Sequence, residues 1–281
     1  MNSINQNSKN KHLLLAITTI FLSLAVFLIC SEIILLFLPV HTSLPFQAVN
    51  SNNPVFHAKP NSEFTYSIGW HFASPNKGQI NNDGFINNQD YQTEGKHPLI
   101  AVIGDSYIEA LAVPYKETLH GRLAHHIGDR GRVYSFGFSG APLSQYLAWA
   151  KHAKETYKPD AMIISVVGND FDESLAKYKK GPGFHHYDIF NDTLILNLYD
   201  YRPNPLREIV HHSWFLQYLF YNLHLPYAKQ KIKSYFKLRR DEVEYIGNTS
   251  AEIPEEKVTS SIKMLNVFFN DLLYHSGLPL D

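Results

Sequence analysis

The chain is almost free of cysteine, because Cys30 is the only one among its 281 residues. A single thiol cannot form a disulfide within the chain or a cysteine-based metal cluster. An excess of charge of one sign is also lacking, with 25 Lys and Arg against 26 Asp and Glu. This balance gives no support for a nucleic-acid surface or a strongly acidic partner. We therefore expect no nucleic-acid partner and no cysteine-based metal site.

One long apolar run stands near the N-terminus, over residues 13–38. It exceeds the roughly 20 helical residues that cross the hydrocarbon core of a bilayer. Lys9 and Lys11 precede it, and no further Lys or Arg appears before Lys59. By the positive-inside rule, residues 1–12 are a cytoplasmic tail, the run is a single anchor in the cell (inner, cytoplasmic) membrane, and the main domain is extracytoplasmic. A cleaved signal peptide is the alternative, but the run is long for one and no small-x-small cleavage site follows it.

The remainder divides at about residue 96. Residues 39–95 are rich in Asn, Ser and Pro, which predicts a stalk and an irregular lead-in. From 96 onward, short apolar runs alternate with segments of helical periodicity. The predicted strands and helices are, in order, 99–103, 116–127, 132–136, 143–157 and 160–167. The alternation predicts an α/β domain over 96–281 with a parallel sheet. The continuous apolar third strand, 160–167, predicts a strand covered on both faces.

The alternation lapses past Asp172. A hairpin is predicted over 187–199, around Asn191-Asp192. Aromatic-rich helices are predicted over 205–225 and 227–239, and a further helix over 254–275. We expect the hairpin and the first two of these helices to be an insertion over about 185–245, acting as a lid or a partner surface. The aromatic residues of the first helix are expected in the helix core; if exposed, they suit a membrane surface or the cover of an acyl pocket. These aromatic residues are Trp214, Phe215, Tyr218, Phe220 and Tyr221.

Polar and glycine residues follow each of the three predicted strands. They are Gly104-Asp105-Ser106, Gly137-Phe138-Ser139-Gly140 and Gly168-Asn169-Asp170. The carboxyl ends of parallel strands are where open α/β sheets bind ligands. A serine on the turn leaving a strand exposes its hydroxyl, a glycine offers an unobstructed N–H, and an asparagine supplies amide donors. Such donors stabilise the oxyanion of acyl transfer, so the three clusters together predict that chemistry.

The sequence at this point resembles the SGNH/GDSL hydrolase family in its membrane-anchored bacterial form. VIGDSYIEA (102–110), SFGFSGAPLSQYL (135–147) and VVGNDF (166–171) resemble its first three blocks, and NNDGF (81–85) resembles the segment before them. The resemblance implies a flavodoxin-like, three-layer α/β/α domain, and Ser106 as the nucleophile. It implies an oxyanion hole made by the backbone N–H groups of Ser106 and Gly140 and by the Asn169 side chain. The supporting residues would be Gly104, Asp105, Gly168 and Asp170.

The chain departs from this family at its fourth block, an Asp followed three residues later by His. No Asp here has that spacing; Asp271 and His275 are four apart, within a predicted helix. We therefore expect the domain to be C-terminally incomplete, with the sequence truncated before a further strand. Serine is a poor nucleophile without a base, and His185 or His186 is the replacement that the segment after the third block offers.

Several features have a simpler interpretation. Asp170 and Asp172 are expected to be a helix N-cap and a solvated turn rather than an acid/base pair. Lys179 and Lys180 are expected on the solvated surface. The adjacent histidine pairs predict no metal site, because neighbouring helical residues point in different directions.

The hypothesis that follows is a membrane-anchored ester hydrolase acting through an acyl-serine intermediate, without a cofactor. Acyl or acetyl esters of envelope glycans or lipids are the expected substrates, because the anchor holds the site beside the membrane. One alternative is an O-acyltransferase that uses the same serine. Another is a catalytically inactive binding or scaffold protein, or a truncated, non-functional fragment. A catalytic Asp and His encoded downstream of this sequence would favour the enzyme, and their absence would favour the binding protein or the fragment.

Overall fold

The structure is a computed structural model that describes residues 2–168, 170–225 and 255–280. The chain divides into two compact units. The anchor unit comprises Met1–Ser43, Ser67–Pro75 and Pro205–Phe236, and the α/β unit comprises Leu44–Tyr66, Asn76–Asn204 and Lys237–Asp281. Each unit is described by itself.

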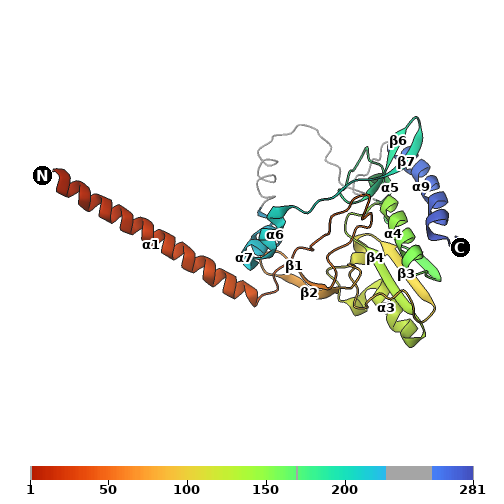
Figure 1. Cartoon of the computed structure of the whole chain (residues 1–281), viewed down its shortest axis with the longest axis horizontal. Coiled ribbons are helices and arrows are strands. Elements are labelled where there is room, and N and C mark those ends of the chain that lie inside the picture. The colour runs from red at the N-terminus through yellow and green to blue at the C-terminus, as the bar shows by residue number, and fades with distance from the viewer. Residues whose placement is uncertain (1, 169, 226–254, 281) are drawn as a thin grey trace. The chain divides into compact units, whose positions relative to one another are not determined.

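The α/β unit contains a parallel sheet of three strands, as the sequence predicts (Figure 1). The strands are β3 (Leu99–Gly104), β4 (Arg132–Gly137) and β5 (Ala161–Ile164), in the order β4-β3-β5. β3 and β4 pair in full register, so that Gly104 lies opposite Gly137. All three predicted strands are present, and β5 is shorter at both ends than predicted.

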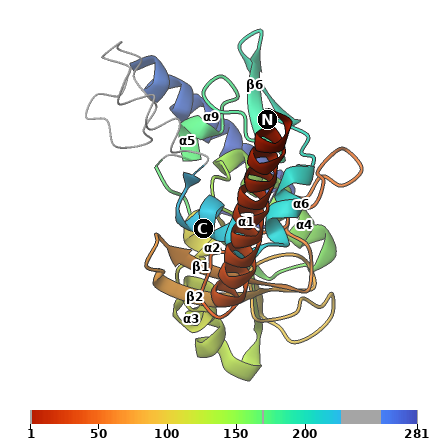
Figure 2. The same ribbon diagram turned by 90° about the vertical axis from the view of Figure 1, so that its left-hand side faces the viewer.

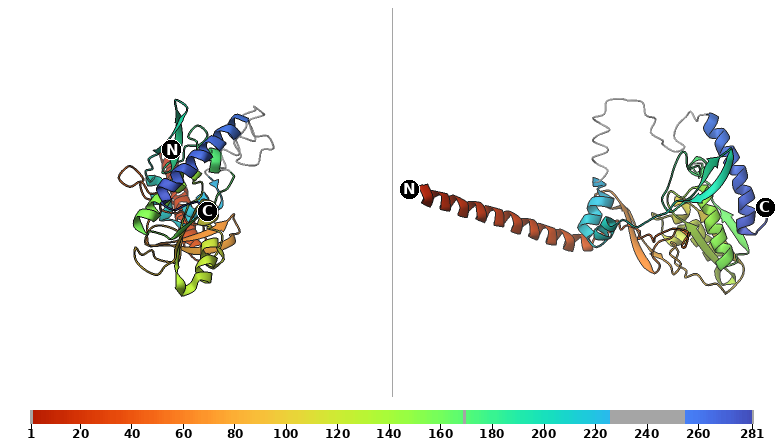
Figure 3. Two further views of the ribbon diagram at one scale, coloured as in Figure 1. Left: turned by 90° about the vertical axis from the view of Figure 1, so that its right-hand side faces the viewer. Right: turned by 45° about the horizontal axis from the view of Figure 1, so that its top comes forward.

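Helices pack on both faces of this sheet because successive β3 residues face opposite sides. Ala101 and Ile103 belong to the large core that includes α4 (Leu143–Thr156) and α9 (Glu255–Ser276), which pack side by side (Figure 3). Val102 belongs to a smaller cluster with residues of α3 (Leu119–Ile127). α3 begins later than predicted, after the short helix η1 (Tyr115–Glu117), because Thr118 Oγ1 accepts the N–H of Gly121 at 3.0 Å and caps a new helix.

β5 is less covered than its sequence indicates. Ala161 and Ile163 are exposed, whereas Met162 and Ile164 pack against the core. Because Ala161 and Ile163 are exposed, the expectation of cover on both faces is corrected. The continuous apolar run reflects the strand's propensity and not its burial on two sides.

The expected stalk over residues 39–95 is also corrected. Val49, Phe56 and Phe85 are buried in the same core as α4 and α9. The segment further contains the paired strands β1 (Ser62–Ile68) and β2 (Ala73–Ile80). Its aromatic residues show no periodicity along the chain, yet they fill the core from an irregular backbone. Most of the lead-in is therefore part of the α/β unit.

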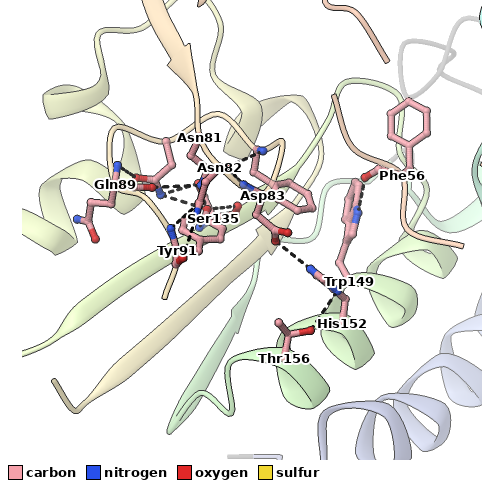
Figure 4. A network of polar contacts seen from close by, with 12 residues as sticks. Phe56, Asn81, Asn82, Asp83, Gln89, Tyr91, Ser135, Trp149, His152 and Thr156 are labelled. Carbon is pink, nitrogen blue, oxygen red and sulfur yellow. Dashed lines mark hydrogen bonds and ion pairs between the residues drawn. The ribbon is translucent and has the colours of Figure 1, made fainter. Parts of the chain in front are cut away.

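A polar network fixes this lead-in to the sheet and to α4 (Figure 4). Asn81 Oδ1 accepts the N–H groups of Asp83 and Phe85 at 3.0 and 2.9 Å, which closes the turn. The buried Tyr91 hydroxyl donates to the Ser135 carbonyl of β4 at 2.6 Å. Asp83 pairs with His152 of α4 at 2.9 Å. The loop is thus held by hydrogen bonds to residues 44 and 69 positions away in the sequence.

The predicted hairpin is present as β6 (His185–Phe190) and β7 (Thr193–Leu198). Asn191 and Asp192 both have positive φ, at 46° and 62°, as a type I′ turn requires. The expectation that the hairpin belongs to an insertion is corrected. Tyr187 is buried in the main core, and its hydroxyl donates to Asp271 of α9 at 2.8 Å. The hairpin is a packed element of the α/β unit.

The anchor unit contains α1 (Asn2–Leu36), whose segment Asn10–Leu36 is long and apolar enough to cross a membrane. The predicted single helix over 205–225 is instead three short ones: α6 (Pro205–His211), α7 (Trp214–Gln217) and the π-helix η3 (Tyr218–Asn222). Ser213 breaks the first helix and caps the second, since its hydroxyl accepts the N–H of Leu216. α7 packs against α1 and α6 against α7 (Figure 2). The helix predicted over 227–239 lies outside the described residues.

Candidate active site

Ser106 lies where the central strand β3 ends, as the sequence predicts. It is the first residue of the short helix α2 (Ser106–Glu109), and its side chain is exposed. Asp105 caps this helix by accepting the N–H of Tyr107 at 3.0 Å. The Ser106 hydroxyl donates to the other Asp105 oxygen at 3.3 Å. The strand, the cap and the helix together present the hydroxyl at the carboxyl edge of the sheet.

Two glycines allow α2 to lie close over the strand ends. A Cβ on Gly104 would lie 2.5 Å from Ile108 Cγ1, and one on Gly137 would lie 2.8 Å from the Gly104 carbonyl oxygen. Side chains at these positions would push α2 away from β3 and β4. The glycines therefore position Ser106, although their own atoms need not contact a substrate.

Glu109 is a site residue that the sequence analysis missed. It ends α2, is only 3% exposed, and accepts hydrogen bonds from the backbone N–H of Ser139 at 3.0 Å and from the Ser139 hydroxyl. These bonds join the helix that carries Ser106 to the loop after β4. Burial raises the pKa of Glu109 to about 7, although both Ser139 bonds favour the ionised form. The available signal was a lone acid in the otherwise apolar run from Ile108 to Val113.

Gly140, the second predicted oxyanion donor, follows Ser139 directly and has φ of +79°. Its carbonyl accepts a hydrogen bond from Lys179 Nζ at 3.2 Å, and the same ammonium pairs with Glu173. Lys179 is therefore not a solvated surface residue, contrary to expectation. It holds the Gly140 peptide in place and brings a positive charge to the site.

The third cluster leads into the short helix α5 (Asp170–Glu173). Asn169, the third predicted oxyanion donor, lies outside the described residues, and Gly168 is exposed just before it. Asp170 is fully buried and accepts from the N–H of Val167 at 2.8 Å and the hydroxyl of Tyr146 at 2.9 Å. Burial raises its pKa to about 7.

The expected N-cap and solvated turn at Asp170 and Asp172 is corrected by this burial. Asp172 is 5% exposed and pairs with Lys257. The acidic run Asp170 to Glu173 suggested solvation because its partners are distant in the sequence. The Asp170 carboxylate accepts from Val167 and so joins the end of the strand segment to the start of α5.

The negative charge of Asp105 links the first and third clusters electrostatically. It adds to burial in raising the pKa values of Glu109, Asp170 and the Tyr146 hydroxyl. Carboxylates from two strand ends thus share one poorly solvated region. The site consists of an exposed serine hydroxyl above carboxyl groups that take up protons near neutral pH.

The histidines considered as replacement bases have other contacts. His186 Nε2 accepts the N–H of Gly181 at 2.9 Å, so its Nδ1 donates to the Glu173 carbonyl at 3.0 Å. His185 Nδ1 lies 2.9 Å from Gln145 Oε1, and burial lowers its pKa to about 4. Within the described ranges, no imidazole is hydrogen-bonded to Ser106. Asp271 is engaged with Tyr187 and is not paired with His275.

Comparisons with protein-family models, with curated proteins and with solved structures find no match to this chain. The assignment of the site therefore depends on its residues and geometry. These place Ser106 and Gly140 on turns joined by Glu109 and Ser139, beside the turn held by Asp170.

Proposed function

We propose that the chain is an ester hydrolase of the SGNH/GDSL type, with the α/β unit outside the cytoplasmic membrane and α1 as its anchor. The observation that carries the proposal is the exposed Ser106 at the end of the central strand, joined to the Gly140 loop through Glu109. The order β4-β3-β5 supports it, because it equals the 2-1-3 order with which flavodoxin-like sheets begin. In such sheets the ligand crevice lies at the carboxyl end of the strand where the order reverses, which here is β3.

In the proposed reaction, Ser106 Oγ attacks the ester carbonyl carbon and its proton passes to a base. The N–H groups of Ser106 and Gly140 donate to the resulting oxyanion, and Asn169 is the proposed third donor. Collapse of the tetrahedral intermediate breaks the bond to the alcohol, which leaves with a proton. Water then attacks the acyl-serine, releasing the acid and restoring the hydroxyl.

Esters of envelope glycans or lipids are the proposed substrates. The support is the proposed anchor, which would restrict the site to ligands near the membrane. Transfer of the acyl group to a sugar hydroxyl in place of water would use the same serine and donors.

A second candidate is a non-catalytic ester-binding protein. The specific observation in its favour is that, in the part of the chain that the structure describes, Ser106 is hydrogen-bonded to Asp105 and to no imidazole. A serine site lacking its base retains only about 10³–10⁴-fold catalysis over water. Such a protein would bind esters in the same crevice without turning them over.

Hydrolysis of p-nitrophenyl acetate by the full chain in detergent micelles separates the two candidates. Ser106→Ala is the test variant, and Ser51→Ala, at an exposed serine in a turn, is the matched control. Turnover that Ser106→Ala abolishes and Ser51→Ala retains supports the hydrolase. Equal rates for the wild type and Ser106→Ala would overturn the proposal and favour the binding protein.

A further inference from the structure

The short helix α7 is attached to the apolar part of α1. The rings of Phe27 and Phe215 meet edge to face, with centroids 6.0 Å apart. Glu32 Oε2 accepts the backbone N–H of Phe215 at 2.6 Å. Glu32 is the single acidic residue in the apolar run, and this bond gives its carboxylate a partner within the protein. α7 is thus fixed against α1 at residues 27 to 32.

The position of these contacts along α1 sets their depth in a bilayer. A helix rises about 1.5 Å per residue and the hydrocarbon core is about 30 Å thick. Counted from Leu13, where the apolar run begins, the core ends near residue 33. Phe27 therefore lies within the hydrocarbon, and Glu32 lies at its outer boundary. Phe215, which contacts both, lies at the same depth.

Polar contacts join two further segments to the helices beside α1. Asn222, at the end of η3, donates to Ser67 Oγ at 2.9 Å and accepts the N–H of His41 at 2.9 Å. The Tyr218 hydroxyl donates to the Trp70 carbonyl at 3.2 Å. These contacts therefore join three segments into one structure at the outer end of α1: the residues that follow α1, those around residue 70, and those from α6 to η3.

This structure exposes large apolar side chains, which we call the juxtamembrane residues: Phe37, Ile68, Trp70, Ile209 and Phe220. Trp70 is 72% exposed and Phe37 80% exposed. Exposed apolar side chains in the same unit as a helix that can cross a membrane are candidates for contact with lipid. Aromatic side chains are enriched at membrane–water interfaces, where apolar rings meet polar headgroups.

We propose that the juxtamembrane residues insert into the outer interface of the bilayer that α1 spans, so that the anchor unit binds the membrane through its surface as well as its helix. A lipid surface is the partner, because these residues belong to the same packed unit as a helix whose contacts with α7 already lie at the hydrocarbon boundary. The inference rests on the proposed membrane anchor and is independent of the ester chemistry.

The helix α6 offers a matched pair of positions for a test. Ile209 is 60% exposed and apolar, whereas its neighbour Glu208 is exposed and pairs with His212 at 3.7 Å. Val210 is buried and faces the body of the unit. Adjacent helical residues point about 100° apart, so Ile209 and Glu208 report on different faces of one helix.

The experiment uses the full chain with Cys30→Ser, reconstituted in phosphatidylcholine vesicles. Ile209→Cys or Glu208→Cys is added and labelled with the environment-sensitive fluorophore NBD. The label at 209 should emit at shorter wavelength, lose fluorescence to lipids with a nitroxide at carbon 5 of the acyl chain, and resist iodide. The label at 208 should show the reverse.

Quenching of both labels by iodide, with no effect of the nitroxide lipid, would overturn the inference. Alkaline carbonate extraction of the same vesicles identifies which part has failed. Protein retained in the membrane with a water-exposed label at 209 shows that the anchor holds and the surface does not insert. Protein released by carbonate shows that the anchor itself is wrong, and the inference fails with it.

Discussion

Burial of Glu109 predicts a defined loss of stability as the pH rises. Its pKa is raised from 4.5 to about 7 in the folded chain, mainly by burial. Between these values the folded state binds more protons than the unfolded state, so the free energy of unfolding falls as the pH increases. Complete ionisation in the folded state costs about 3 kcal/mol, at about 1.4 kcal/mol for each tenfold change in proton affinity.

The substitution Glu109→Gln removes this ionisation and retains a carbonyl oxygen that accepts from Ser139. The stability of the variant relative to the wild type should therefore rise by about 2–3 kcal/mol between pH 5 and pH 8. Asp170, which also has a raised pKa, is present in both proteins, so the comparison isolates Glu109.

Urea unfolding of the full chain in a non-ionic detergent measures this difference. Trp149 is fully buried in the core of the α/β unit, and its fluorescence reports unfolding there. If the free energies of unfolding of the wild type and of Glu109→Gln change with pH in the same way, the reasoning is refuted. That result would show that Glu109 is ionised in the folded chain without cost. The same outcome would remove the basis for describing the site as poorly solvated.

Three further test substitutions, two of them with a control, concern the core and the site. Phe268→Ala, on the face of α9 that is buried in the core, should lower the free energy of unfolding by about 3–5 kcal/mol, measured by urea titration. Gly140→Ala and Gly128→Ala each place a side chain at positive φ, at a cost of about 1–3 kcal/mol, but only Gly140→Ala should abolish ester turnover. Equal turnover in the two glycine variants would exclude Gly140 from the site. Tyr91→Phe removes buried hydrogen bonds to β4 and should cost about 1–3 kcal/mol, whereas the exposed Tyr107→Phe should leave unfolding unchanged.

The elements that were predicted from the sequence are those with a strong local pattern. The runs that form β3 and β4, the periodic helices α4 and α9, and the Asn191-Asp192 turn are each specified by their own residues. The strand-end clusters were found for the same reason, since Ser106 follows its strand directly.

The features that were missed depend on partners distant in the sequence. Phe56 and Phe85 lie in an irregular segment, so no periodicity marks them as core residues. Glu109 is explained by Ser139, 30 residues away, and Lys179 by Gly140, 39 residues away. Tertiary contacts of this kind override the local expectation that charged side chains are solvated.

The break in the predicted helix over 205–225 is a different kind of error. Ser213 is an N-cap residue type followed by a short apolar segment, and such a cap is a local signal. The aromatic content of the segment indicates one amphipathic helix, whereas the cap at Ser213 indicates that a new helix begins there.

The central claim is that Ser106 is a nucleophile, and reaction of the full chain with a fluorophosphonate tests it most directly. The adduct is located by mass spectrometry of peptides, with and without added imidazole, beside the Ser106→Ala variant. Added imidazole supplies a general base from solution, so that labelling does not depend on a base within the chain. The account predicts an adduct on Ser106 that is absent from the variant. A folded protein that forms no adduct at Ser106 under either condition would contradict it.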